Sequence, residues 1–253
     1  MTTLITGASS GIGLELAKIF AREGHDLVLV ARRRDRLETL MESILSEHDI
    51  QVTLIVEDLS QDGAPQRVVD VLCGRSIDVL VNNAGSGDYG FFVETDVEKT
   101  SQMIHLNVLS LTTLTRLLLP SMVARQSGKI LNVASVAAFM PGPTSSVYFA
   151  SKAFVLSFSE ALSNELETSG VSVTVLCPGA TSTEFDTAAG SDWGEAYRKK
   201  IPTAQAVAQF GYKALMAEKR LAIYGWTNRL IVILLRFIPR HFILKSARYW
   251  LSE

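Results

Sequence analysis

A tyrosine and a lysine stand four residues apart, as Tyr148 and Lys152, in a stretch of helical character. A helix places both side chains on one face, close enough for the ammonium group to influence the phenol. A free tyrosine has a pKa of about 10, and lowering it to neutral pH takes roughly 4 kcal/mol of preferential stabilisation of the phenolate. The pair therefore indicates proton transfer to or from a substrate oxygen.

A glycine-rich turn follows the first apolar run of the chain. It reads Thr6-Gly7-Ala8-Ser9-Ser10-Gly11-Ile12-Gly13 and leads into a helical pattern from Leu14. Glycines let the backbone approach a pyrophosphate, and the free N–H groups at the helix start attract its charge. Tight strand-to-helix turns also use glycine for steric reasons alone. The position after the first strand favours a dinucleotide held by Gly7, Ser9, Ser10, Gly11, Ile12 and Gly13.

Basic residues follow the second apolar run, Asp26 to Ala31, where NAD-preferring sites carry an acid for the ribose 2′-hydroxyl. An arginine fork suits a 2′-phosphate, so NADP(H) is predicted over NAD(H), with Arg32 the first candidate and Arg33 the second. We interpret Arg34 and Arg36 as the solvated start of a helix.

The third apolar run is followed by Glu57-Asp58-Leu59, and Asp58 and Leu59 are expected at the cofactor site. Asp58 would accept from the adenine amine, cap the following helix, or do both.

The elements that must position these residues are short apolar runs alternating with amphipathic stretches. The runs are Leu4–Thr6, Leu27–Ala31, Val52–Val56, Val79–Val81, Ile130–Val133 and Val171–Leu176. The alternation predicts an α/β fold of the Rossmann type: a doubly wound parallel sheet with helices on both faces and ligands at the carboxyl ends of its strands.

The 253 residues contain no repeat or linker, so residues 1–253 are predicted to form a single domain. A net charge of −2 gives no general attraction to nucleic acid, and no such partner is expected. The α/β rhythm is interrupted at about 184–202, which we interpret as a substrate flap or a plain surface loop with equal weight.

Further motifs appear in order along the chain: Asn82-Asn83-Ala84-Gly85, Asn107, Ser135, the Tyr148/Lys152 pair, and Pro178-Gly179 with Thr183. Together with the glycine turn, which satisfies the pattern TGxxxGxG, they resemble the short-chain dehydrogenase/reductase family over roughly residues 3 to 183. The resemblance implies a Rossmann-type fold, a nicotinamide cofactor and a dimer or tetramer.

The resemblance also implies roles for particular residues. Ser135 would hold the substrate oxygen, Tyr148 would exchange a proton with it while hydride moves, and Lys152 would contact the nicotinamide ribose. Asn107 would anchor a water that links Lys152 to solvent, or would simply satisfy backbone groups in a distorted helix. The remaining cofactor contacts would come from Asn83, Ala84, Gly85, Pro178, Gly179, Thr181 and Thr183.

Apolar residues are expected around the substrate, which favours a hydrophobic ketone, aldehyde or alcohol. They are Phe91, Phe92, Phe139, Met140, Phe185, Trp193 and Tyr197, and core packing is the alternative for each. Arg198, Lys199 and Lys200 are interpreted as a solvated helix face. Cys73 and Cys177 are expected to be reduced thiols of a cytoplasmic protein, with Cys177 in packing. The four histidines show no ligand spacing, so no metal is expected.

The C-terminal tail, about 226–253, mixes aromatic and basic residues and is too interrupted to span a membrane. A subunit interface or a lid is the first interpretation, and a peripheral membrane contact is the second. For the whole chain we predict an NADP(H)-dependent carbonyl reductase or alcohol dehydrogenase. The alternatives are an NADP(H)-binding sensor or scaffold without turnover, and the same fold running epimerisation or dehydration.

Overall fold

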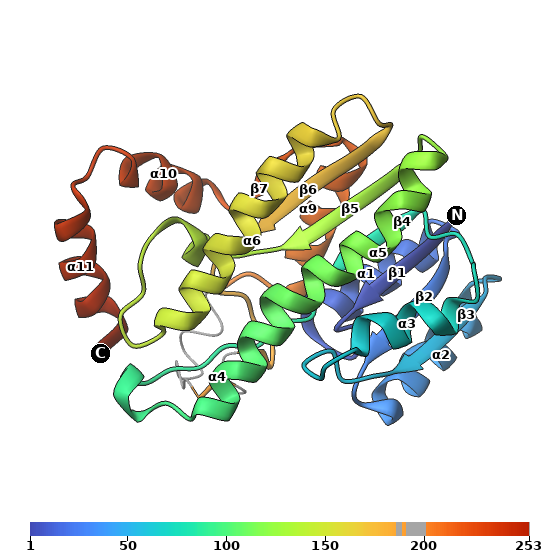
Figure 1. Cartoon of the computed structure of the whole chain (residues 1–253), viewed down its shortest axis with the longest axis horizontal. Coiled ribbons are helices and arrows are strands. Elements are labelled where there is room, and N and C mark those ends of the chain that lie inside the picture. Colours follow the sequence, from blue (N-terminus) through green and yellow to red (C-terminus); the bar gives the residue numbers. More distant parts are fainter. Residues whose placement is uncertain (186–188, 191–200, 253) are drawn as a thin grey trace.

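A seven-stranded, entirely parallel sheet forms the centre of the protein, with the strand order β3-β2-β1-β4-β5-β6-β7 (Figure 1). The computed structural model describes residues 1–185, 189–190 and 201–252, with backbone only for 249–252. The strands are β1 (Thr2–Thr6), β2 (Asp26–Ala31), β3 (Val52–Val56), β4 (Val79–Asn82), β5 (Gly128–Val133), β6 (Val171–Cys177) and β7 (Leu221–Ile223).

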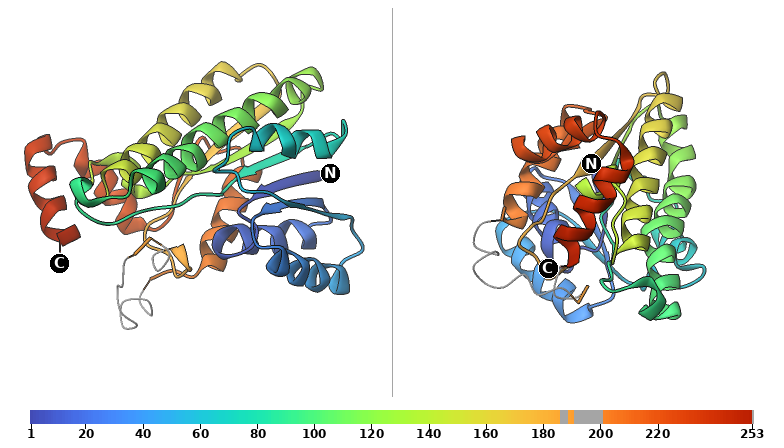
Figure 2. Two further views of the ribbon diagram at one scale, coloured as in Figure 1. Left: turned by 60° about the horizontal axis from the view of Figure 1, so that its bottom comes forward. Right: turned by 90° about the vertical axis from the view of Figure 1, so that its left-hand side faces the viewer.

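Helices connect the strands and cover both faces of the sheet (Figure 2). One face carries α1 (Gly11–Arg22), α2 (Arg34–Glu47) and α9 (Ala204–Met216). The other carries α3 (Ala64–Leu72), α5 (Leu111–Ala124) and α6 (Ser146–Glu165). This is the doubly wound arrangement that right-handed crossovers between parallel strands produce, and it confirms the predicted fold class.

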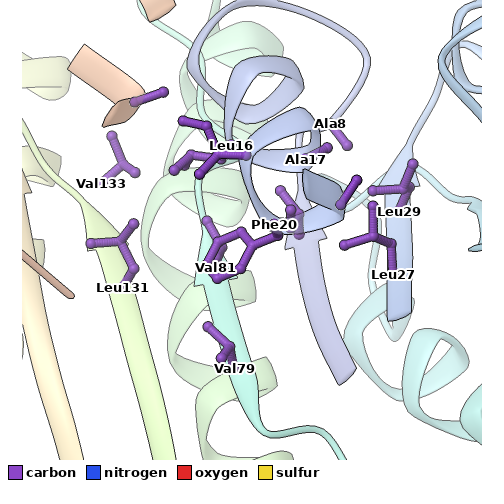
Figure 3. Packing of buried hydrophobic residues seen from close by; sticks show 14 of the residues in the cluster. Ala8, Leu16, Ala17, Phe20, Leu27, Leu29, Val79, Val81, Leu131 and Val133 are labelled. Carbon is purple, nitrogen blue, oxygen red and sulfur yellow. The ribbon is translucent and has the colours of Figure 1, made fainter. Parts of the chain in front are cut away.

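The core under α1 shows how the apolar pattern builds this layer (Figure 3). Leu16, Ala17 and Phe20 point from one face of the helix onto β1 and β4, and all three are fully buried. These side chains pack in one cluster with Val79 and Val81 of β4, which share one face of the sheet because alternate residues of a strand point to the same side. This packing fixes the helix start, and hence the glycine turn, against the carboxyl end of β1.

One long helix changes its winding in the middle. Residues Val97–Ile104 form α4, His105–Ser110 form a π-helix (η2), and α5 continues to Ala124. The combined helix, Val97–Ala124, is the one stretch of the described chain that is long and apolar enough to cross a membrane by length and composition. Its inner face packs in the core through Leu114, Leu118 and Met122.

The chain after the sheet ends in two helices, α10 (Trp226–Leu235) and α11 (Arg240–Ser252), which cover the predicted tail. Both lie at one end of the molecule, and α11 stands apart from the sheet (Figures 1 and 2). Short 3₁₀ turns, η1 (Phe92–Glu94) and η3 (Val136–Phe139), complete the described elements. The six predicted strands are present, whereas β7 was not predicted.

Candidate active site

The glycine turn is held to the neighbouring strand β4 by hydrogen bonds. The Thr6 hydroxyl accepts from the backbone N–H groups of Asn83 and Ala84, both at 3.0 Å. The Asn83 amide donates back to the carbonyl oxygens of Thr6 and Gly7, at 3.0 and 3.2 Å. The two loops at the carboxyl ends of β1 and β4 therefore form one rigid wall.

Glycine is required in this wall because the chains approach too closely for side chains. A Cβ on Gly13 would lie 2.4 Å from the Gly7 carbonyl oxygen and from the Asn83 amide nitrogen. Gly7 has a φ of +67°, and a Cβ there would lie 2.8 Å from the same nitrogen. Gly11 has a φ of +56° and faces Thr183, whose methyl group would lie 3.2 Å from an added Cβ. The backbone is thus open to a ligand at Gly7 and Gly11, while Gly13 serves packing.

A cavity of about 480 Å³ runs along the carboxyl ends of the strands, from this turn to Lys152. A narrow, glycine-lined cleft at the start of α1 suits the pyrophosphate of a dinucleotide, so the residues present fit a nicotinamide cofactor. The cavity brings together most of the predicted site residues: Gly7, Ser9, Ser10, Gly11, Ile12, Arg32, Arg33, Asp58, Leu59, Asn83, Ala84, Gly85, Ser135, Tyr148, Lys152, Pro178, Gly179, Thr181 and Thr183. Gly13 and Asn107 do not line it.

At one end of the cavity, Arg33 lies over the glycine turn. Its guanidinium donates to the Ser9 hydroxyl at 3.1 Å and to the Ser10 hydroxyl at 2.8 Å. It also pairs with the Glu184 carboxylate at 2.8 Å, and Arg36 pairs with the other oxygen of that carboxylate. The Arg33 and Arg36 hydrogen bonds lower the pKa of Glu184. Arg36 is exposed near the start of α2, as predicted, and its ion pair with Glu184 is a contact that the sequence did not indicate.

Asp58 and Arg32 line the same cavity and form an ion pair with each other. The Arg32 guanidinium lies 3.6 Å from the Asp58 carboxylate, which also accepts from the backbone N–H and the hydroxyl of Ser60. Burial opposes ionisation of Asp58, but the bonds from Ser60 and the charge of Arg32 outweigh it and lower its pKa. Asp58 does not cap the next helix, since α3 begins after Gly63. That part of the prediction was wrong, because a turn separates the strand end from the helix.

At the other end, Lys152 is buried under the cavity. Its ammonium nitrogen donates to the Val133 carbonyl oxygen at 3.0 Å and lies 5.8 Å from the centre of the Tyr148 ring. Burial is the main influence on the ammonium, and it lowers the pKa of Lys152 to about 8. A lysine with this pKa stays mostly protonated at neutral pH but releases its proton more readily than an ordinary lysine, which suits a group that stabilises a phenolate and passes protons.

Tyr148 and Ser135 face the same cavity from two elements. Tyr148 lies in the first turn of α6, one helical turn before Lys152, and its ring packs against Phe185 with centroids 5.5 Å apart. Ser135 follows β5, and its hydroxyl accepts from the backbone N–H of Ala137 at 3.1 Å. The proton-transfer pair and a hydroxyl donor are therefore positioned by the end of one strand and the start of one helix.

Asn107 sits in the π-helix and is almost fully buried. Its amide donates to the Ser86 carbonyl oxygen at 2.9 Å and to the Ser151 hydroxyl at 3.0 Å, and its carbonyl oxygen accepts from the Ser86 N–H. A Cβ on Gly85 would lie 3.2 Å from the Asn107 oxygen and 3.3 Å from the Lys152 nitrogen. Asn107 thus satisfies backbone groups and shares the space beside Gly85 with Lys152.

The aromatic residues predicted at the substrate divide into three groups. Met140 and Phe185 line the cavity. Phe91 and Phe92 are exposed around η1 and do not line the cavity, so these two predictions were wrong. Phe139 packs on the core, which is the alternative that the sequence left open for it. The segment after Gly90 turns outward, which apolar residue type alone did not indicate. Trp193, Tyr197, Arg198, Lys199 and Lys200 lie outside the described residues.

Known proteins resemble this chain in both sequence and structure. The family model for short chain dehydrogenase matches residues 1–193. A very-long-chain 3-oxoacyl-CoA reductase from Rattus norvegicus is 37% identical over 186 residues, 72% of this chain and 60% of that protein. The 17-beta-hydroxysteroid dehydrogenase type 3 of Mus musculus is 38% identical over 183 residues, 71% of this chain and 60% of that protein. A short-chain dehydrogenase from Sphingobium yanoikuyae in complex with NADPH has a TM-score of 0.84 and 35% identity, covering 92% of this chain and 91% of that one.

These matches show the family. The chain belongs to the short-chain dehydrogenase/reductase family, and the relatives named above are a reductase, a hydroxysteroid dehydrogenase and a dehydrogenase solved with NADPH. The predicted family is thereby confirmed. The matched region is about three fifths of the length of the two curated relatives.

Proposed function

We propose that this protein is an NADP(H)-dependent oxidoreductase that interconverts a hydrophobic carbonyl compound and its alcohol. The observation that carries the proposal is the convergence of Ser135, Tyr148 and Lys152 on one cavity that continues to the glycine turn. A binding module that only senses the cofactor has no use for a phenol beside a buried ammonium group. The sensor alternative therefore has no observation in its favour.

The glycine turn and the cavity beyond it would hold a reduced nicotinamide cofactor, which would supply the hydride that carbonyl reduction needs. The Tyr148 hydroxyl donates its proton to the carbonyl oxygen, and the Ser135 hydroxyl holds that oxygen by a hydrogen bond. The Lys152 ammonium then stabilises the Tyr148 phenolate, and the proton returns along Lys152 and the polar groups around Asn107. In alcohol oxidation, the same groups remove the hydroxyl proton.

The preference for NADP(H) is supported by the charges at the turn. Arg33 joins the hydroxyls of Ser9 and Ser10, while Arg32 pairs with Asp58. A 2′-phosphate bound near these arginines would accept charge-assisted hydrogen bonds from their guanidinium groups, whereas a 2′-hydroxyl offers them no anion. The structure supports Arg33 as strongly as Arg32, because Arg33 already contacts the turn.

Substitution of the arginines tests this preference. Arg33→Ala is expected to raise KM for NADPH by roughly 10- to 100-fold, since a hydrogen bond to a charged group contributes about 1.5–3 kcal/mol. KM for NADH should change by less than threefold. Arg34→Ala is the matched control, because among the described residues Arg34 forms an ion pair only with Glu38, one turn along α2. Glu184→Gln should lower KM for NADPH by releasing Arg33. Equal effects of Arg33→Ala on both cofactors would contradict the assignment.

A hydrophobic substrate is supported by the lining and by the relatives. Met140 and Phe185 border the cavity beside Tyr148. The two curated relatives are named for a 3-oxoacyl-CoA and for a 17-beta-hydroxysteroid, both bulky molecules with an apolar body. A cavity with an apolar wall and a small convergent set of polar groups suits such molecules.

The proposed reaction is tested by NADPH oxidation, followed by absorbance, across ketones graded in chain length and ring number. We expect kcat/KM to rise with apolar size, by roughly threefold or more for each buried methylene group, from about 0.8 kcal/mol each. The reverse reaction is assayed with the matching alcohols and NADP+. Absence of turnover in both directions, with NADPH binding confirmed by fluorescence in the same cuvette, would reject the proposal.

A further inference from the structure

The two C-terminal helices expose an unusually apolar surface. On α10, Val232 is buried, while Leu230, Ile231, Ile233 and Leu234 are all exposed. Aromatic rings extend this surface: Trp226 is 76% exposed, Phe237 79% and Phe242 55%. On α11, Ile243 and Ala247 are buried and Leu244 is exposed. An apolar area of this extent is typical of a surface that meets another phase or another molecule.

The charge of the same segment is one-sided. Residues 226–252 contain five Lys and Arg residues and no Asp or Glu, which leaves 19 basic against 26 acidic residues in the rest of the chain. Arg236, Arg240, Lys245 and Arg248 are exposed, and none of them forms an ion pair with the residues that the structure describes. Four cations without an ion-pair partner among the described residues therefore lie among the exposed apolar side chains.

The basic residue within α10 holds this helix against the rest of the fold. Arg229 donates to the Ile223 carbonyl oxygen at 2.9 Å and lies over the Phe210 ring. The neighbouring Asn228 donates to the Tyr224 carbonyl oxygen at 2.8 Å and packs on Gly179, where an added Cβ would lie 2.6 Å from its nitrogen. The start of α10 is thus fixed to the segment that follows β6, while the part of the chain that the structure describes leaves its apolar outer side exposed.

We propose that the segment 226–252 docks the protein on the surface of an anionic phospholipid membrane. Exposed aromatic and aliphatic side chains enter the region between headgroups and acyl chains, and Arg and Lys side chains reach the lipid phosphates. Charge complementarity favours this occupant over a second copy of the chain, because two copies meeting through this surface would bring like charges together. Neither helix crosses the bilayer, since α10 has 10 residues and α11 has 13.

Vesicle sedimentation of the full chain, without cofactor or substrate, tests the proposal. Phosphatidylcholine vesicles containing 30% phosphatidylserine as a trial composition are expected to pellet the protein, and pure phosphatidylcholine vesicles to do so at least tenfold less well. The triple variant Arg236→Gln, Arg240→Gln and Lys245→Gln should weaken binding about 100-fold. That is about fivefold per cation, or about 1 kcal/mol each at 1.4 kcal/mol per tenfold.

Two further variants separate the contributions and control for charge. Phe237→Ser with Ile233→Ser should weaken binding at least tenfold while leaving the salt dependence unchanged. Lys18→Gln with Lys213→Gln removes exposed charges from α1 and α9 and should leave binding unchanged. Thermal unfolding of each variant establishes that it is folded.

Several results would overturn the proposal. Equal binding to neutral and anionic vesicles would do so, as would equal losses in the tail and control variants. A halved mass in sedimentation of the Phe237→Ser and Ile233→Ser variant would assign the surface to a second copy. Loss of carbonyl reduction in that variant without any vesicle binding by the parent protein would assign it to a substrate lid. Because the assay contains no substrate, its failure leaves the proposed reaction unaffected.

Discussion

Tyr148→Phe is expected to lower kcat for carbonyl reduction by about 10²–10⁴-fold, the usual contribution of a positioned acid or base. The substitution removes only the hydroxyl, so the ring keeps its contact with Phe185 and the cavity keeps its shape. NADPH affinity should change by less than twofold. Stopped-flow measurement of a single turnover isolates the chemical step from product release.

A control variant makes the result specific to the phenol. Tyr89 also lines the cavity, so Tyr89→Phe removes a second hydroxyl from the same space. It should retain most of the turnover. If Tyr148→Phe keeps more than a tenth of the parent kcat, the proton must come from another group, and the proposed mechanism is wrong.

Lys152→Met is expected to abolish turnover and, at pH 7, to stabilise the protein without its cofactor. Burial lowers the pKa of the ammonium from 10.5 to about 8. That difference corresponds to roughly 3 kcal/mol of disfavoured charge in the folded state. Methionine avoids this cost but loses the bond to the Val133 carbonyl oxygen, about 1 kcal/mol. A net gain of about 2 kcal/mol should raise Tm by roughly 4–8 °C.

The gain from Lys152→Met depends on pH with a definite sign. Below about pH 8 the lysine is protonated in both states, so the cost is fully present and the variant has its greatest advantage. Between about pH 8 and 10.5 the unfolded chain binds more protons than the folded one, so the parent protein gains stability as pH rises. The two proteins should converge above that range.

Urea unfolding at several pH values measures this difference, with Lys18→Met as the control on the exposed face of α1. A Lys152→Met protein that is less stable than its parent at pH 7 would show that the ammonium stabilises the fold rather than straining it.

The parts that were predictable from sequence are those that depend on local pattern. Apolar runs at regular intervals predicted six of the strands, and the order of motifs predicted which residues gather at their carboxyl ends. The strand β7 escaped prediction because it has three residues, Leu221–Ile223, too few to show a pattern. Its place at the edge of the sheet comes from pairing with β6.

Contacts between distant residues were not predictable. Glu184 follows β6 and reaches Arg33 and Arg36, about 150 positions earlier, and no local signal announces that pair. The buried chain of hydrogen bonds from Asn82 to Asn132 and on to Ser159 is likewise not indicated by any local sequence pattern. It joins β4, β5 and α6 through polar residues that each look unremarkable in sequence. Sequence pattern finds elements and motifs, whereas partners across the sheet need the three-dimensional arrangement.

The central place of β1 in the sheet has a consequence for how the chain folds. Strand β1, which precedes the other strands in the chain, lies between β2 and β4, and the pair Thr3↔Val79 joins positions 76 residues apart. Such non-local pairings form late, because a long loop must close before any contact compensates its entropy. During synthesis, β1, β2 and β3 can pair before β4 has been made, and until then the edge of β1 that faces away from β2 has no partner strand. The wall made by Thr6 and Asn83 then closes, and the cleft is completed only when the chain beyond β6 has emerged.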